Sequence, residues 1–218
     1  MITAHNGADR TRENSMAFVR HALSSSADAL EIDIRRHPDG TLVFTHDIND
    51  APSSSLDPVR SVFEALRGTG KLVNCDLKEG GLEDDVFSLA RACGVEDRLI
   101  YTGTVSAAHC KETGLNRIVR IALNIEEYIP GLYARCLDAS MPAYSMAQTA
   151  VCAEEMCRIC LQYDIPRINA HYRLATLPFQ EVLRQNGVDL SVWTVNDPAE
   201  LKRFVQAGVY NVTTRNLP

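Results

Sequence analysis

Residues 29–34 read Ala-Leu-Glu-Ile-Asp-Ile, a run in which apolar and acidic side chains alternate. Alternation with a period of two is typical of a β-strand, whose successive side chains point to opposite faces. Glu31 and Asp33 therefore face one side, roughly 6–7 Å apart, and the apolar residues face the other. If the apolar side packs against helices, both carboxylates point inward, where burial without a partner costs several kcal/mol. The pattern indicates a hard divalent cation held by oxygen ligands, or a lysine, as that partner.

Two histidines accompany the carboxylates within the first fifty residues. His5 ends a predicted first strand at 2–5, and His46 ends another apolar run at 42–46. Imidazole titrates near neutrality, so a pair of histidines can carry protons in both directions. The combination indicates metal-assisted cleavage of an ester or phosphodiester. Taken singly, each residue also has a structural interpretation, as a hydrogen-bonded strand-end histidine or as an acidic pair on a solvated face.

Bulk properties narrow the class of protein. A chain of 218 residues with 45% apolar and 23% charged residues fits one globular domain, 1–218. The net charge of −6 argues against nucleic acid as a partner. No apolar run approaches the roughly 20 residues needed to span a bilayer, and the chain enters a strand directly, without a signal-peptide pattern. We therefore expect a cytoplasmic protein with a small-molecule substrate; the sequence sets no oligomeric state.

The cysteine pattern fits the same compartment. Seven cysteines cannot all pair within the chain, and reduced thiols are typical of the cytosol. Cys157 and Cys160 have the CxxC spacing of zinc or redox sites, but they fall inside a predicted helix, 148–163. We interpret them as buried apolar thiols and assign them no function.

The order of elements predicts the fold. β-type runs alternate with amphipathic helical stretches, and Asp39-Gly40 predicts a hairpin that folds 42–46 back beside the second strand. The region 124–145 is the least clear, with a further short strand considered near Ser140–Pro142. One predicted helix begins after Ser15. The others span 59–66, 82–93, 148–163, 177–186 and 198–207. Without the hairpin arm, eight strands are predicted at 2–5, 29–35, 72–78, 99–102, 118–123, 166–169, 190–194 and 210–213.

Eight parallel strands joined by helices close into a (β/α)₈ (TIM) barrel of the α/β class. An open doubly wound sheet is the alternative, but no GxGxxG or Walker loop supports it. In a barrel the reactive residues gather where the strands end. There the sequence places His5, Glu31, Asp33, His46, Asp76, Lys78, Trp193, Thr194, Asn196, Thr213, Thr214 and Arg215.

Several motifs keep the order of a known family. The matches are His5-Asn6-Gly7, Glu13-Asn14-Ser15, Glu31-Ile32-Asp33, His37-Pro38-Asp39-Gly40, His46-Asp47, Asp76-Leu77-Lys78, Trp193-Thr194-Val195-Asn196 and Gly208-Val209…Thr213-Thr214…Pro218. Together they cover nearly the whole chain, which resembles the glycerophosphodiester phosphodiesterase family, a group of TIM barrels of the phospholipase C-like type. Two departures concern the site. Asn6 stands where the family has an arginine that grips the phosphate, and Asp76 replaces a metal-binding glutamate.

The resemblance implies roles for these residues. A Mg²⁺ or Ca²⁺ ion is expected on Glu31, Asp33 and Asp76, and His5 and His46 are expected to be the general acid and base, in an order the sequence leaves open. Three residues are expected to bind the substrate: Asn6 with a neutral amide, Lys78 with a positive charge for the phosphate, and Trp193 with an apolar wall for the alcohol. The expected reaction is hydrolysis of glycerophosphodiesters to glycerol phosphate and an alcohol.

Three other functions are compatible with the scaffold. A phospholipase D-like activity on lysophospholipids would need an apolar groove beside Trp193. A degenerate barrel that binds a phosphorylated metabolite without turnover is compatible with Asn6. A sugar-phosphate isomerase is disfavoured, because nothing marks a proton-abstraction site away from the acidic residues.

Overall fold

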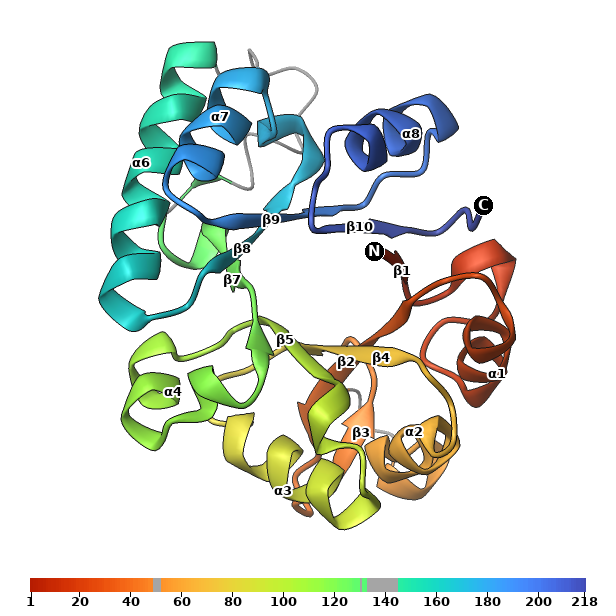
Figure 1. Ribbon diagram of the computed structural model, residues 1–218. Helices are drawn as coiled ribbons and strands as arrows, with labels where there is room; N and C mark the ends of the chain where they lie inside the picture. Colours follow the sequence, from red (N-terminus) through yellow and green to blue (C-terminus); the bar gives the residue numbers. More distant parts are fainter. Residues whose placement is uncertain (49–51, 130, 133–144) are drawn as a thin grey trace.

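The computed structural model describes residues 1–48, 52–129, 131–132 and 145–218 and is a barrel of parallel strands with helices around it. Figure 1 looks roughly along the barrel axis. The parallel strands are β1 (Ile2–Ala4), β2 (Ala29–Arg36), β4 (Leu72–Leu77), β5 (Leu99–Gly103), β6 (Arg120–Ile121), β7 (Leu123–Asn124), β8 (Arg167–His171), β9 (Asp189–Trp193) and β10 (Asn211–Thr214). Their spatial order is β6-β5-β4-β2-β1-β10-β9-β8-β7. The predicted (β/α)₈ class is confirmed.

The barrel closes through a strand that is divided in two. Strands β6 and β7 are separated by Ala122; β6 pairs with β5, and β7 pairs with β8. The Ala122 amide still bonds the Tyr101 carbonyl at 2.9 Å. The predicted fifth strand at 118–123 is therefore one interrupted position in the barrel, which makes eight positions in all.

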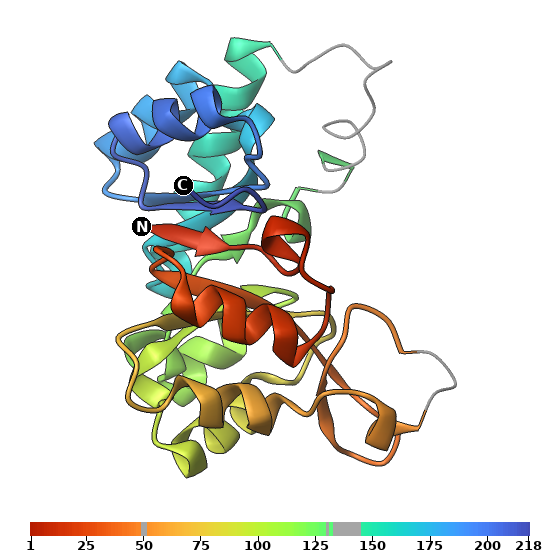
Figure 2. The ribbon, with the colours of Figure 1, turned by 90° about the vertical axis from the view of Figure 1, so that its right-hand side faces the viewer.

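Seven described helices surround the strands, and the side view in Figure 2 shows them lying along the outside of the barrel. Side chains accept backbone N–H bonds at several helix starts, as Ser15 does for α1 and Asp197 for α8. The helices are α1 (Met16–Ser24), α2 (Val59–Leu66), α3 (Glu83–Cys93), α4 (Ala107–Thr113), α6 (Met146–Tyr163), α7 (Leu177–Gln185) and α8 (Pro198–Gln206). Within the described ranges, none is both long and apolar enough to span a membrane.

The apolar core lies between the strands and the helices. On β2, Leu30, Ile32 and Ile34 are at most 1% exposed and belong to this layer. Alternation then turns Glu31 and Asp33 into the barrel, where they are 6% and 5% exposed. The outward apolar residues thus hold the two acids in place on the inner face.

The hairpin that Asp39-Gly40 predicts is present. Strand β3 (Leu42–Phe44) runs antiparallel to the end of β2, with Phe44 opposite Ile34. Beyond β3 the Thr45 amide bonds the Asp33 carbonyl at 3.0 Å. These contacts bring the chain at His46 back to the end of β2.

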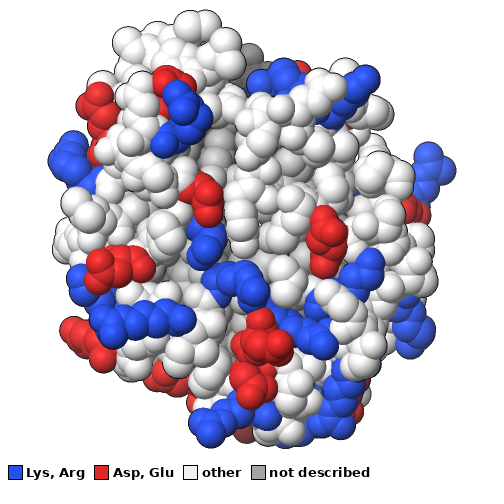
Figure 3. Space-filling model, viewed as in Figure 1, with Lys and Arg blue, Asp and Glu red and all other residues white. Residues whose placement is uncertain are grey.

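Some expectations differ from the structure or fall outside it. Helix α4 was not predicted, because residues 107–113 form a short helix with only two buried side chains. The possible strand near Ser140–Pro142 lies outside the described residues. The six described cysteines are free, and Cys157 and Cys160 are buried on α6, as interpreted from the sequence. On the face drawn in Figure 3, basic and acidic side chains are interspersed.

We predict that Gly103→Ala destabilises the protein more than Gly114→Ala. Both glycines have positive φ, +81° and +79°, so both substitutions carry a backbone penalty of about 1 kcal/mol. A Cβ at Gly103 would also collide with the Leu77 carbonyl and the Asp76 carboxylate, whereas nothing lies within 4 Å of a Cβ at Gly114. Urea unfolding should show a further loss of roughly 1–3 kcal/mol for Gly103→Ala. Equal losses in the two variants would contradict this close approach.

Candidate active site

The eight residues to which the sequence analysis gave a catalytic, metal-binding or substrate-binding role all line one cavity of about 490 Å³ at the carboxyl end of the barrel. Of the other residues expected at the strand ends, Thr213 and Arg215 also line it, and Thr194, Asn196 and Thr214 do not. Four strands contribute most of the eight: β1 leads into His5 and Asn6, β2 holds Glu31 and Asp33, β4 holds Asp76 and leads into Lys78, and β9 ends at Trp193; the hairpin adds His46. The cavity is thus built from segments far apart in the chain. Their catalytic and binding roles stay predictions.

Three carboxylates form the acidic cluster of this cavity, defined as Glu31, Asp33 and Asp76. Strands β2 and β4 are paired in register, which sets Asp33 directly beside Asp76 and Glu31 beside Asn74. One oxygen from each carboxylate lies within 4.8 Å of the other two. Such a group of oxygens matches the ligands of a hard divalent cation.

Lys78 lies against two members of the cluster. Its Nζ is 2.8 Å from Asp33 Oδ1 and also contacts Asp76 Oδ2. Burial alone would lower the Lys78 pKa, but the two carboxylates outweigh it and raise the pKa, so the lysine is charged. Burial alone would raise the Asp33 pKa. The charge of Lys78 and its hydrogen bond outweigh that effect, so the pKa of Asp33 lies below its ordinary value.

One lysine does not neutralise three carboxylates. Burial, together with the negative charges of Asp33 and Asp76, raises the pKa of Glu31 well above its ordinary value. The Asn6 backbone N–H donates to Glu31 Oε2 at 2.8 Å and offsets part of this effect. The three carboxyl groups therefore resist being ionised together, and a divalent cation at the cluster would favour their ionised forms.

The side chain of Asn6 supports the cluster. It is 3% exposed, and its amide nitrogen donates to Asp33 Oδ2 at 2.9 Å and to Asn14 Oδ1 at 2.6 Å. Its oxygen accepts from the Asn14 backbone N–H at 2.8 Å. The next residue, Gly7, has φ +81°, and a Cβ there would lie 2.6 Å from Glu13 Cγ. Both the nitrogen and the oxygen of the Asn6 side-chain amide are therefore hydrogen-bonded to other residues of the protein.

His5 is partly buried beside the cluster. Its Nδ1 lies 2.9 Å from the Asn6 carbonyl oxygen and 3.1 Å from Nε of Arg215. Burial lowers the His5 pKa, and the positive charges of Arg215 and Lys78 lower it further. A neutral imidazole, able to accept a proton, is therefore the favoured form near pH 7.

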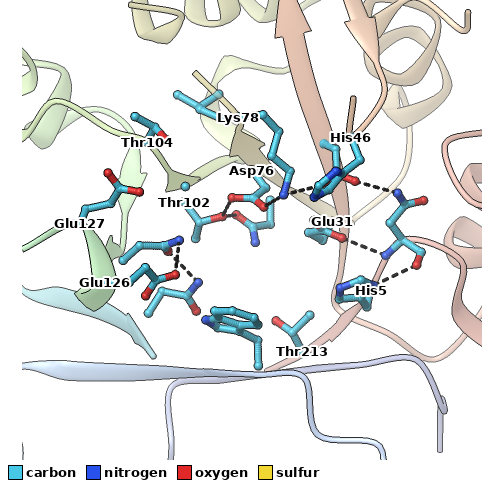
Figure 4. A pocket seen from close by; sticks show the side chains of 18 of the residues that line it. His5, Glu31, His46, Asp76, Lys78, Thr102, Thr104, Glu126, Glu127 and Thr213 are labelled. Carbon is cyan, nitrogen blue, oxygen red and sulfur yellow. Dashed lines mark hydrogen bonds and ion pairs between the residues drawn. The ribbon is translucent and has the colours of Figure 1, made fainter. Parts of the chain in front are cut away.

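His46 occupies a more open position. Its side chain is 59% exposed, and Nδ1 lies 3.0 Å from Asp47 Oδ2. The Arg35 Nε donates to the His46 carbonyl at 2.6 Å and fixes the backbone there. Figure 4 shows His5, Glu31 and His46 on the same side of the cavity.

The opposite side of the cavity carries polar residues that the sequence did not single out. Figure 4 shows Glu126 and Glu127 there. Asn169 donates to Asn124 Oδ1 at 2.9 Å, and Asn124 donates to Glu126 Oε1 at 3.1 Å. Burial raises the pKa of Glu126 to about 7, with the charge of Asp76 adding to the shift. Residues 124–127 lie in the region that was hardest to interpret from the sequence, so no periodicity pointed to them.

Trp193 is supported from the neighbouring strand. The His171 ring meets it edge to face, with centroids 5.6 Å apart, and also lies 4.8 Å from the Tyr172 ring. Burial lowers the His171 pKa to about 4, so this ring is neutral at physiological pH. His171 is a packing residue that the sequence prediction omitted; its place at the end of β8 was the available signal.

Known proteins share this architecture. No family model matches the chain. A glycerophosphodiester phosphodiesterase from Caldanaerobacter subterraneus subsp. tengcongensis is 21% identical over 98% of this chain and 93% of its own length. The chain is similar to glycerophosphodiester phosphodiesterases. This finding confirms the resemblance seen in the motifs.

Solved structures agree on the fold. A glycerophosphodiester phosphodiesterase from Parabacteroides distasonis superposes with a TM-score of 0.70 at 17% identity, covering 98% of this chain and 92% of that one. A phosphodiesterase from Oleispira antarctica, solved with the product sn-glycerol-3-phosphate, gives a TM-score of 0.71 at 14% identity, with the same coverages of 98% and 92%. At these identities the likeness establishes the barrel fold.

We predict that Glu126→Gln stabilises the metal-free protein in a pH-dependent way. The native pKa of Glu126, about 7, lies above its ordinary value of 4.5, so native protein binds the proton more tightly than unfolded protein. The stability that this tighter proton binding gives the native protein is complete below pH 4.5 and is lost as the pH rises through 7. The advantage of the variant should therefore be absent at pH 4.5 and reach on the order of 1–3 kcal/mol above pH 7.

Urea titrations between pH 4.5 and 8.5, with a chelator present, measure this difference. Glu127→Gln, one residue along and exposed, is the control and should show no such trend. A Glu126→Gln advantage that is constant across the range would contradict the assigned shift.

Proposed function

We propose that the protein is a metal-dependent phosphodiester hydrolase that cleaves glycerophosphodiesters to glycerol phosphate and an alcohol. The observation that carries the proposal is one cavity that combines the acidic cluster with Lys78, His5 and His46. Sequence similarity to a glycerophosphodiester phosphodiesterase over nearly the whole chain supports it. So does the product sn-glycerol-3-phosphate in the structurally similar Oleispira phosphodiesterase.

The acidic cluster suits a divalent cation on two independent grounds. One oxygen from each carboxylate lies within 4.8 Å of the other two, and the cluster holds three carboxyl groups against the single lysine that contacts it. Glu31, Asp33 and Asp76 would hold Mg²⁺ or Ca²⁺, both of which prefer oxygen ligands. When bound, the ion would offset charge on the phosphoryl oxygens and orient the group for in-line displacement.

The histidines would manage the protons of hydrolysis. The partly buried His5, whose pKa is lowered, suits the base that removes a proton from the attacking water. The exposed His46, bonded to Asp47, suits the acid that protonates the departing alcohol oxygen. The water oxygen then forms a new P–O bond, the P–O bond to the alcohol oxygen breaks, and the alcohol is released. Lys78 would hold Asp33 and Asp76 in place and add positive charge near the phosphate.

The lining of the cavity favours a small polar substrate over a lysophospholipid. Across from the histidines it presents Glu126 and Glu127. Glu126 accepts a hydrogen bond from Asn124, which accepts one from Asn169, and Trp193 is the large aromatic residue of the described lining. An acyl chain would have to bury against these polar groups without satisfying them, which is unfavourable. A glycerol or amino-alcohol group can form hydrogen bonds there.

Binding without turnover is the second candidate. The observation that favours it is the position of Asn6, whose amide is directed to Asp33 and Asn14 and adds no positive charge for a phosphate. Turnover separates the two functions.

We predict hydrolysis of glycerophosphocholine and of bis(p-nitrophenyl) phosphate in the presence of Mg²⁺ or Ca²⁺. His5→Ala and His46→Ala should each lower kcat by about 10²–10⁴-fold, the range for removal of a general acid or base, and Glu31→Ala should abolish metal-dependent activity.

The matched control is His109→Ala. His109 is also an exposed histidine paired with an aspartate, at 2.7 Å from Asp84, but it lies outside the cavity lining. It should retain full activity. If activity survives all three cavity substitutions, the mechanism is wrong; if the wild type cleaves no phosphodiester, binding without turnover is favoured.

We predict that Mg²⁺ or Ca²⁺ raises the Tm of the wild type and not that of Glu31→Gln. An ion that binds the native state alone stabilises it by about 2.7 kcal/mol at 100 times its Kd. The control is Glu83→Gln, which removes another buried glutamate, 1% exposed and bonded to the Ser106 amide at 2.7 Å, outside the cavity lining. It should lower the Tm yet keep the metal response. An equal metal-induced rise in Glu31→Gln would place the ion elsewhere.

A further inference from the structure

Arg215 places a second positively charged side chain at the cavity, in addition to Lys78. Among the described lining residues, the lysines and arginines are Lys78 and Arg215. Lys78 is already held between Asp33 and Asp76. The mechanism proposed above assigns no task to Arg215, whose side chain is 44% exposed at the cavity.

The fold anchors the backbone of Arg215 and leaves its guanidinium at the cavity. The Arg215 amide donates to Asn196 Oδ1 at 2.9 Å, and its carbonyl accepts from the Asp9 amide at 2.8 Å. The preceding residue, Thr214, pairs with Ala4, so the ends of β10 and β1 lie side by side. Arg215 therefore projects from a fixed point next to His5.

The guanidinium has one good partner and one poor one. Nη1 lies 2.8 Å from Glu13 Oε1, an ion pair between two side chains that are about half exposed. Nε donates to His5 Nδ1 at 3.1 Å, although the Asn6 carbonyl oxygen lies 2.9 Å from the same nitrogen. Nδ1 cannot accept from Arg215 and donate to Asn6 at once. The contact with His5 is thus one that an anion in the cavity can displace.

We propose that Arg215 binds the phosphate group of the substrate, exchanging its contact with His5 for a forked pair of N–H bonds to phosphate oxygens. Five N–H donors in a planar fork suit this task, and two nitrogens account for the contacts with Glu13 and His5. Departure of Arg215 leaves His5 Nδ1–H to the Asn6 carbonyl and exposes Nε2 as the basic nitrogen. This proposal deepens the proposed function and rests on it for the identity of the anion.

Glu13 has a defined part in this arrangement. Its carboxylate competes with the phosphate for the guanidinium, and it is held against Gly7, where a Cβ would lie 2.6 Å from Glu13 Cγ. If Arg215 only fastens the 7–14 segment to β10, loss of either partner of the pair has the same effect. If Arg215 binds anions, loss of Glu13 frees it and loss of Arg215 removes it. The two variants then have opposite effects.

Calorimetric titration of inorganic phosphate into the Mg²⁺-loaded protein tests the proposal. Arg215→Met should weaken phosphate binding about tenfold or more, and Arg215→Lys, which keeps the charge without the fork, should be intermediate. Glu13→Gln should bind phosphate as tightly as the wild type or more tightly. The control is Arg203→Met, because Arg203 is also 44% exposed and paired with a glutamate, but lies on α8 outside the cavity lining. It should bind like the wild type.

The outcomes separate this proposal from the proposed function. Wild-type phosphate binding in Arg215→Met, equal losses in Arg215→Met and Glu13→Gln, or no phosphate binding by the wild type would each overturn the role of Arg215. Kinetics with glycerophosphocholine should show a raised KM in Arg215→Met. If the wild type binds phosphate through Arg215 but cleaves no diester, the proposed hydrolysis fails and the role of Arg215 stands.

Discussion

Three carboxylates turned into one end of the barrel are the constraint on which the site depends. Glu31 and Asp33 face inward because Leu30 and Ile32, on the other face of β2, are fully packed beneath the helices. Pairing in register with β4 adds Asp76 beside Asp33. Repulsion among the three is offset by Lys78 and by the amides of Asn6, and only in part. Burial of acids at such a cost is expected where they bind a ligand.

The apolar residues that stabilise the barrel are separate from the polar residues that line its cavity. Its apolar core lies outside the strands, so the inner end can be lined with amides, hydroxyls and charges without loss of packing. Within the cavity the groups are again divided: Figure 4 shows His5 and His46 on one side and Glu126 and Glu127 on the other. A diester with its phosphate near the histidines would extend its alcohol toward the second side. In the proposed function, these two sides would orient a small polar substrate along its length.

Much of this arrangement could be predicted from the sequence because it follows from local patterns. Alternation in 29–34 determines which way the acids face, and Asp39-Gly40 determines the hairpin that returns His46. What could not be predicted depends on contacts between distant segments. The pairing of Arg215 with Glu13 requires β10 to lie beside β1, and the place of Glu126 requires the break between β6 and β7 at Ala122. Neither contact has a signature in local periodicity.

The location of a bound ion tests the account most directly. Crystals grown or soaked with Mn²⁺, which takes oxygen ligands like those of Mg²⁺, allow the ion to be located by anomalous scattering. The account predicts one strong peak within about 2.0–2.6 Å of an oxygen atom from each of Glu31, Asp33 and Asp76. A map with no peak among these carboxylates at saturating Mn²⁺, or with the ion held by other residues, would contradict it.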